Sequence, residues 1–303
     1  MNALMKGEEW HMDGETWVRA KGIEEFRDTT VPLLSARPAE NIQLLAVFDR
    51  LLREGPHAFG EHDPELLTWH GSQGTAALLR TPPYPYILSG DPDEESISAL
   101  VEILLDSADS HDGREINVPA ACEPALVEAW TERGGHRPRV VERLRLYRLE
   151  APLDPDPSPP GRAKLADPGD VPAVARFLQE FWAAIERDQP LDATMTAQRI
   201  AAARIAEGVF WLWMDEADEP VSVAGTTPII AGTGRIGPVF TPAPLRGRGY
   251  AGAVTTAAGR ALLDHGADQV LLFTDLANAT SNALYQRVGY RPVSDRMRIA
   301  LEG

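Results

Sequence analysis

The sequence has little cysteine, no long apolar run and fewer basic than acidic residues. A single cysteine, Cys122, in 303 residues excludes an internal disulfide framework and fits a reducing compartment. No apolar run approaches the roughly twenty residues of a membrane-spanning helix, and no signal peptide is evident, so we expect a cytoplasmic protein. The formal net charge of −16 argues against nucleic acid or an anionic membrane as the main partner.

Patterns typical of metal ligands and of activated nucleophiles are missing as well. The histidines at positions 57, 62, 70 and 111 have no ligand spacing with one another or with the cysteine, so we predict no metal site. No histidine or cysteine lies near an evident nucleophile motif, which argues against a hydrolase triad.

The length is sufficient for two domains, each with its own core. Residues 151–161 are rich in proline, which removes backbone donors and favours extended geometry. We therefore predict a first domain over 1–150, a linker over 151–161 and a second domain over 162–303.

Apolar periodicity and turn residues predict the elements of the first domain. They are helices near 41–53, 91–105 and 123–133 and strands near 66–70, 75–80, 84–89 and 115–118. In the second domain the same signals predict helices near 170–185, 195–206, 250–265 and 281–288. Strands are expected near 162–165, 209–214, 221–230, 235–241 and 269–274, with a final strand pair from 290 to 301. This alternation predicts an α/β fold in which sheets are flanked by helices.

One loop of the second domain has the chemistry of an anion site. Residues 246–251 follow a short apolar strand and lead directly into a helix rich in small residues. Gly247 and Gly249 lack the Cβ atoms that would keep a ligand from the backbone, so successive N–H groups can point at a phosphate. The helix dipole, with Arg246 and Arg248 beside it, favours a pyrophosphate.

The spacing of this loop resembles the Arg-x-x-Gly-x-Gly/Ala acyl-CoA signature of the GNAT acyltransferase superfamily. A second motif follows in the expected order, because residues 278–290 resemble that family's Asn-x-x-Ser…Leu-Tyr-x-x-x-Gly-Tyr helix. The resemblance implies two GNAT-like domains, each with a mixed, mostly antiparallel twisted sheet.

The resemblance also implies an activity, namely transfer of an acyl group from acetyl-CoA, or another short acyl-CoA, to an amine by direct attack. The acceptor would be a small molecule or a peptide. Val239, Phe240 and Thr241 match the strand whose backbone binds the pantetheine arm. Arg246, Gly247, Arg248, Gly249, Tyr250 and Ala251 match the residues that hold the pyrophosphate. Tyr285 matches a phenol that acts as general acid. Asn278 matches an asparagine that contacts the cofactor.

These residues also have structural interpretations, which the sequence leaves open. Tyr285 could be an amphipathic core residue of its helix, and Asn278 could be a helix cap. The general base could be Glu180, Glu186, Asp188 or Asp275, or a chain of water molecules. The sequence indicates no particular acceptor, acyl length or oligomeric state.

The ends of the two domains resemble each other. Residues 135–138 and 142–146 align with 289–292 and 295–299, which suggests a duplication. The first copy has an acidic, proline-interrupted stretch, residues 88–95, where the second has its Arg/Gly loop. A pyrophosphate would be repelled there. We therefore interpret residues 1–150 as a degenerate GNAT-like copy.

Two other functions remain open at this point. Residues 247–252 also satisfy the Gly-x-Gly-x-x-Gly dinucleotide fingerprint, although in that motif the first glycine follows its strand immediately. Alternatively, the protein could sense acyl-CoA without turning over an acceptor.

Overall fold

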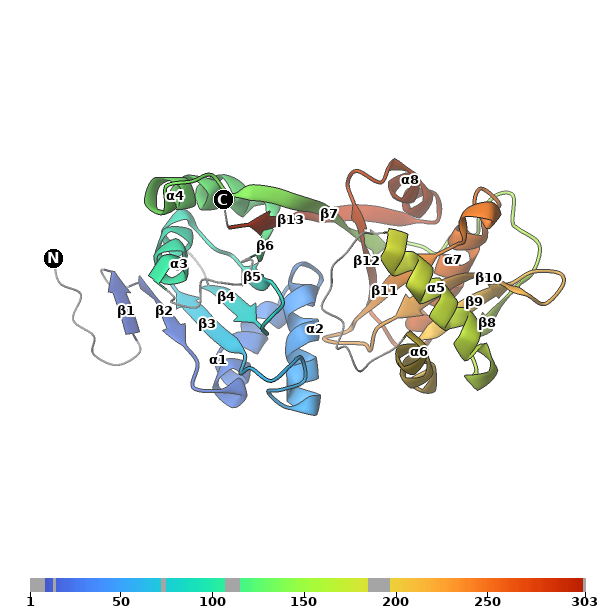
Figure 1. Ribbon diagram of the computed structural model, residues 1–303, viewed down its shortest axis with the longest axis horizontal. Helices are drawn as coiled ribbons and strands as arrows, with labels where there is room; N and C mark the ends of the chain where they lie inside the picture. The colour runs from blue at the N-terminus through green and yellow to red at the C-terminus, as the bar shows by residue number, and fades with distance from the viewer. Residues whose placement is uncertain (1–8, 13–14, 72–74, 107–114, 185–196, 302–303) are drawn as a thin grey trace. The chain divides into compact units, whose positions relative to one another are not determined.

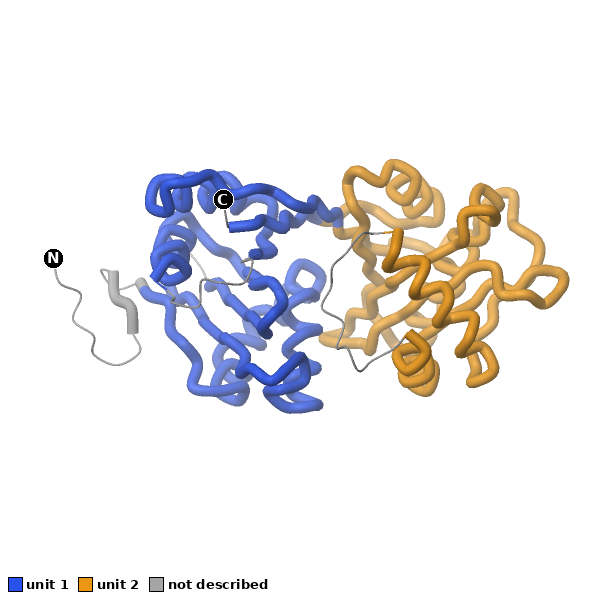
Figure 2. The backbone as a smooth tube through the Cα atoms, viewed as in Figure 1, with its two compact units in different colours: residues 1–145, 294–303 blue, residues 146–293 orange. Residues whose placement is uncertain are grey.

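The computed structural model describes residues 9–12, 15–71, 75–106, 115–184 and 197–301. The chain forms two compact units (Figure 2), residues 1–145 with 294–303 and residues 146–293. The predicted mixed, mostly antiparallel sheet flanked by helices is confirmed in both units.

Unit 1 contains the strands in the order β1-β2-β3-β4-β5-β6-β13 (Figure 1). All the described pairings are antiparallel except the one between β5 and β6, which is parallel. The strands of the first half are β1 (Glu9–Met12), β2 (Glu15–Arg19), β3 (Glu65–His70), β4 (Thr75–Arg80), β5 (Tyr86–Gly90) and β6 (Glu115–Pro119). The helices are α1 (Ile23–Ser35), α2 (Pro38–Glu54), α3 (Glu94–Asp106) and α4 (Glu123–Gly134), with a 3-10 turn, η1 (Ala120–Cys122).

Unit 2 repeats this plan with the strand order β7-β12-β11-β10-β9-β8. Only β11 and β12 pair in parallel among the described registers. The strands are β7 (Arg139–Leu149), β8 (Arg162–Leu165), β9 (Phe210–Met214), β10 (Pro220–Thr226), β11 (Thr233–Phe240) and β12 (Gln269–Asp275). The helices are α5 (Val171–Ala184), α6 (Ala197–Ala206), α7 (Tyr250–Asp264) and α8 (Ala279–Arg287), with 3-10 turns η2 (Pro168–Asp170) and η3 (Ala243–Leu245).

Two apolar layers cover the sheet of unit 2. On one face, α5 and α6 pack against Phe210, Leu212 and Phe240. On the other face, α7 and α8 pack against a second set that includes Ile236 and Leu272. Each strand buries alternate side chains on opposite faces, so the direction of a side chain can be derived from its position.

The predicted final strand pair is wrong, because residues 290–300 form one long strand, β13 (Tyr290–Ala300). The segment contains no glycine that would allow a tight two-residue hairpin turn. Its last part pairs antiparallel with β6, from Arg296 opposite Pro119 to Ala300 opposite Glu115. The last strand of the second half therefore completes the sheet of unit 1, while β7 of the first half ends in unit 2.

The proline-rich segment 151–161 belongs to unit 2. Leu153 N–H donates to Val288 O at 3.3 Å, and Trp213 Nε1 donates to Pro160 O at 2.9 Å. On α7, Arg260 forms an ion pair with Asp154 at 2.7 Å. These contacts attach the segment to the domain that follows it in the chain.

The pairing of β13 with β6 leads to a prediction about stability. Ile299 on β13 is fully buried in the core of unit 1. We expect Ile299→Ala to lower the free energy of unfolding of unit 1 by about 2–5 kcal/mol, because a large-to-small change leaves a cavity. Hydrogen exchange should report faster opening of the amides of β6. The matched control is Leu33→Ala on α1, where the side chain is 48% exposed. We expect this substitution to change the free energy of unfolding by no more than about 0.5 kcal/mol. If the β6 amides were as well protected in Ile299→Ala as in the wild type, the pairing of β13 with β6 would be contradicted.

Candidate active site

The site begins where β11 separates from β12. The parallel pairing between them runs from Thr233 opposite Gln269 to Ile236 opposite Leu272 and is not described beyond that pair. On its other side β11 continues along β10, with Val239 opposite Ala224. Between these registers the single residue Gly225 lies opposite two residues of β11, Gly237 and Pro238, which form a β-bulge. The bulge therefore lies at the point where the two parallel strands part.

Small residues make this bulge possible. A Cβ at Gly225 would lie 2.9 Å from the Gly237 carbonyl oxygen and 3.0 Å from the Phe210 ring. Any larger side chain would push the two strands apart. The bulge therefore depends on glycine at this position.

The three residues after the bulge direct their side chains into the protein. Phe240 is 7% exposed and packs against Phe177 of α5, with ring centroids 6.3 Å apart. The hydroxyl of Thr241 lies 2.8 Å from that of Ser222, and Val239 packs on the α7 side. Because the side chains are occupied in this way, the group that β11 can offer a ligand here is its backbone.

The predicted phosphate loop lies at the start of α7. Gly247 has φ 76° and Gly249 has φ 85°, a left-handed conformation that favours glycine. Gly249 is the N-cap residue of α7, and neither a side-chain cap nor an acidic residue in the first turn satisfies its N–H groups. The N-terminus of α7 therefore keeps the donors and the positive dipole end that an anion requires.

The two arginines of the loop are exposed. Arg246 Nε donates to Thr241 O at 3.0 Å, and Arg248 Nη2 donates to Pro244 O at 3.4 Å. Of the other predicted pyrophosphate residues, Tyr250 is buried and Ala251 is half-buried in the first turn of α7. The loop thus presents backbone and positive charge at the surface.

The proline-rich segment lies against this helix start. The ring of Pro159 is buried, and a Cβ at Gly249 would lie 3.4 Å from its Cδ atom. One turn further on, a Cβ at Gly252 would lie 3.0 Å from Pro155. The hydroxyl of Thr256 donates to Leu153 O at 2.8 Å. These contacts fix the position of the first turns of α7.

Tyr285 lies on α8 and is 8% exposed. Burial raises the pKa of its phenol to about 12, so the proton is retained at neutral pH. Its ring packs among other tyrosines, 6.4 Å from Tyr147 and 6.0 Å from Tyr290. Its hydroxyl makes no hydrogen bond to any residue that the structure describes. Tyr285 is therefore both a core residue and a protonated donor without a protein acceptor.

Asn278 is the N-cap residue of α8, and its Oδ1 accepts a hydrogen bond from Ser281 N–H at 3.0 Å. Of the general-base candidates, Asp275 accepts from Ala277 N–H at 2.8 Å and so closes a turn. Glu180 is exposed on α5. Residues 186 and 188 lie outside the described part of the chain.

The corresponding position in unit 1 is filled by a side chain. There β5 and β6 pair in parallel as far as Ile87 opposite Asn117. Arg296 of β13 is 3% exposed, and its Nη2 donates to Leu88 O at 2.6 Å and to Asn117 O at 3.1 Å. The guanidinium therefore bridges the two strands where they would separate.

The N-terminus of α3 in unit 1 is also occupied. Asp93 Oδ1 accepts from Ser96 N–H at 2.8 Å, and Glu94 and Glu95 lie in the first turn. Carboxylates already interact with the positive end of this helix dipole.

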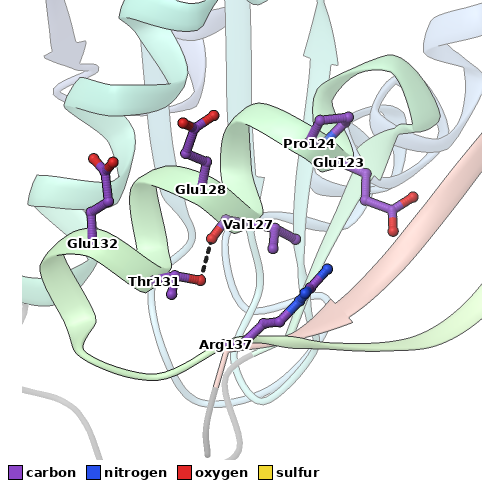
Figure 3. A pocket seen from close by; sticks show the side chains of 7 residues that line it. All are labelled: Glu123, Pro124, Val127, Glu128, Thr131, Glu132 and Arg137. Atoms are coloured by element: carbon purple, nitrogen blue, oxygen red, sulfur yellow. Dashed lines mark hydrogen bonds between the residues drawn. The ribbon is translucent and has the colours of Figure 1, made fainter.

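A surface hollow lies elsewhere in unit 1, along α4 (Figure 3). Glu123, Glu128 and Glu132 line it together with Arg137, and Thr131 donates to Val127 O at 2.6 Å within it. This acidic lining disfavours a pyrophosphate. The hollow contains none of the predicted site residues.

Within the described ranges, no helix combines the length and the apolar character needed to cross a membrane. The same residues contain no group of three or more side chains arranged to hold a metal ion.

One residue of the second unit was missed by the sequence analysis. Arg235 lies on β11 two positions before the bulge and is half-buried. A charged residue flanked by Gly234 and Ile236 in an otherwise uncharged strand is the sequence signal that could have identified it.

Comparison with known proteins agrees with the geometry of unit 2. Residues 171–290 match the family model described as the acetyltransferase (GNAT) family. Residues 171–290 therefore form a GNAT-family domain within the second half of the chain. No curated protein matches the sequence.

Solved structures resemble the chain over both halves. A GCN5-related N-acetyltransferase from Sphaerobacter thermophilus has a TM-score of 0.61 at 17% identity, covering 96% of this chain and 97% of its own. One from Kribbella flavida has a TM-score of 0.56 at 18% identity, covering 88% and 96%. A tandem GNAT protein from the clavulanic acid biosynthesis pathway has a TM-score of 0.53 at 12% identity, covering 95% and 99%. At these identities the likeness shows the fold, which is that of two GNAT-like domains.

The burial of Tyr285 predicts a dependence of stability on pH. Its pKa is about 12 in the folded protein against an ordinary value of 10.0. As the pH rises between these values, the unfolded chain loses the proton while the folded protein keeps it, so the free energy of unfolding falls. Below pH 10 this contribution is constant. We expect Tyr285→Phe to reduce the fall by about 1 kcal/mol per pH unit, measured by urea unfolding at pH 9 and pH 11. Equal falls in both proteins would show that Tyr285 titrates like an exposed tyrosine.

Proposed function

We propose that the protein is an acyl-CoA-dependent N-acyltransferase that uses acetyl-CoA or another short acyl-CoA. The observation that carries this proposal is the glycine-rich start of α7, which has no side-chain cap and follows a strand that separates from its neighbour and the short turn η3. The two features supply an anion site and a strand edge beyond its described pairing with β12 within one continuous segment, and an acyl-CoA needs both.

In this proposal the N–H groups of residues 247–251 hold the pyrophosphate, and Arg246 and Arg248 add positive charge beside it. The backbone of residues 239–241 binds the pantetheine arm, which places the thioester at the bulge. An N–H of the separated strand stabilises the oxyanion that develops on the thioester carbonyl. Asn278 contacts the cofactor from the start of α8.

The reaction is direct attack by an amine. The nitrogen lone pair forms a bond to the carbonyl carbon, and the carbon–sulfur bond then breaks with its electron pair on sulfur. The phenol of Tyr285 gives its proton to that thiolate. The ammonium protons of the acceptor leave to water or to a base, so the products are an amide and free CoA. A buried phenol that makes no hydrogen bond to a described residue suits this role, because its proton is not already engaged by those residues.

We propose further that the first half, residues 1–150, is a degenerate copy that binds no acyl-CoA. Two observations support this. Arg296 occupies the point where β5 and β6 would separate. Asp93 caps α3, the helix whose start would hold a pyrophosphate. The linked second half, residues 162–303, then supplies the activity.

A dinucleotide site fits the loop less well. In the dinucleotide fingerprint the first glycine follows its strand at once, whereas here η3 (Ala243–Leu245) lies between β11 and Gly247. An acyl-CoA sensor without turnover uses the same loop, and catalysis separates it from the proposed enzyme.

The loop can be tested by calorimetric titration of the protein with acetyl-CoA, with NADH as the comparison ligand. We expect one acetyl-CoA site per chain, at least tenfold weaker in Gly249→Glu, because the new carboxylate would repel the pyrophosphate. Gly266→Glu is the matched control, since Gly266 also has positive φ but a Cβ there would meet no atom within 4 Å. Two sites per chain would contradict the degenerate first copy. Binding of NADH but not acetyl-CoA would favour the dinucleotide function.

The general acid can be tested with Tyr285→Phe. We expect kcat for CoA release with a panel of amines to fall about 10²–10⁴-fold while the Kd for acetyl-CoA is kept, because only proton transfer is removed. Tyr290→Phe is the control, since its buried hydroxyl has no partner in the described structure. Equal kcat in Tyr285→Phe and the wild type would remove Tyr285 from the mechanism. Acetyl-CoA binding without acylation of any amine would favour the sensor.

A further inference from the structure

Arg235 faces the side of the sheet opposite α7. A Cβ on its neighbour Gly234 would lie 2.8 Å from Leu262 of α7, and Ile236 packs in the α7 cluster. Because side chains alternate along a strand, Arg235 points to the other face. There its guanidinium carbon lies 6.0 Å from the centroid of the Phe273 ring.

The charge of Arg235 has no counter-ion in the described structure. Its guanidinium makes no hydrogen bond or ion pair with any described residue. Burial and the positive charge of Arg204 on α6 lower its pKa. Arg204 lies over the Phe210 ring and donates from Nη2 to Thr226 O at 2.8 Å. A half-buried guanidinium with no carboxylate beside it and with a second positive charge nearby is a favourable place for an anion.

The position of Arg235 places it on the acceptor side of the proposed reaction. In the proposed complex the pantetheine arm follows residues 239–241, and the pyrophosphate lies at the loop after the strand. The thioester lies at the bulge of β11, at Gly237 and Pro238. The Cα of Arg235 lies about 7 Å further back along the strand, at about 3.3 Å per residue. It therefore lies beyond the acyl end of the bound acyl-CoA.

The two faces of the sheet then have different roles. Tyr285 belongs to the cluster of the α7 face, where the sulfur of the thioester would receive its proton. Arg235 lies on the α5 and α6 face, and in this proposal the acceptor amine approaches the carbonyl carbon from that face, beyond the described pairing of β11 with β12.

We propose that Arg235 binds a carboxylate of the acceptor, so that the substrate is a small amine that also carries a carboxylate, as amino acids do. This inference rests on the proposed acyltransferase function. The planar fork of a guanidinium matches the two oxygens of a carboxylate and orients the attached amine. Since the formal net charge of −16 does not attract anions at long range, recognition of the carboxylate requires local positive charge.

The test compares acceptors in matched pairs, each common amino acid against its carboxamide, with acetyl-CoA as donor. We expect the wild type to favour the acids by kcat/KM and Arg235→Gln to lose about 10–100-fold of that preference, the equivalent of one charged hydrogen-bonded contact. Arg235→Lys should keep kcat but raise KM for the acids, because it keeps the charge and loses the fork. The control is Arg176→Gln on α5, an exposed arginine, which should behave as the wild type.

Acetyl-CoA binding distinguishes a failure of the transferase function from a failure of the carboxylate site at Arg235. All four proteins should bind acetyl-CoA equally, since Arg235 lies outside the proposed cofactor contacts. If acetyl-CoA binds but no amine is acylated, the transferase function fails. Calorimetric binding of the acids to the CoA-bound protein then decides the inference. Binding that is lost in Arg235→Gln supports the carboxylate site, and absence of binding overturns it. Equal preference for acids and carboxamides in the wild type, or an unchanged preference in Arg235→Gln, also overturns it.

Discussion

The structure of unit 2 depends on one local constraint, the insertion of an extra residue into β11 opposite Gly225. The bulge forces β11 to leave β12 while it stays paired with β10, so a gap opens inside a sheet that is otherwise continuous. The backbone groups freed in this way cannot remain unsatisfied without cost. In unit 1 the Arg296 guanidinium donates to Leu88 O and Asn117 O, whereas in unit 2 Ser222 and Arg246 donate to Phe240 O and Thr241 O.

The two units therefore differ in what lies at the place where two parallel strands separate. In unit 1 protein side chains occupy both places where the proposed cofactor would lie, Arg296 between β5 and β6 and Asp93 at the start of α3. In unit 2 the helix start has no acidic residue and the nearby arginines are exposed. A difference of a few side chains on a common backbone plan accounts for an occupied and an available site.

Much of the fold could be predicted from the sequence, because periodicity reports which face of an element is buried. The helix near 41–53 and the strands near 75–80 and 269–274 agree with α2, β4 and β12 within a few residues. The single strand at the C-terminus could not be predicted, since its partner β6 is remote in sequence. The burial of Arg296 and the half-burial of Arg235 could not be predicted either, because burial of a charge depends on which strands lie beside it. The left-handed backbone at Gly247 and Gly249 was predictable, because glycine is the residue that adopts this conformation most readily.

The exchange of β13 has a consequence for synthesis of the protein. Unit 2 needs only residues 146–293, so every residue of its sheet has been made before the last strand of unit 1 is complete. Unit 1 begins at the N-terminus but lacks a strand until residues 294–303 are added. The usual order, in which the N-terminal domain completes its fold first on the ribosome, is thus reversed. The edge of β6 stays unpaired until residues 296–300 of β13 have been synthesised.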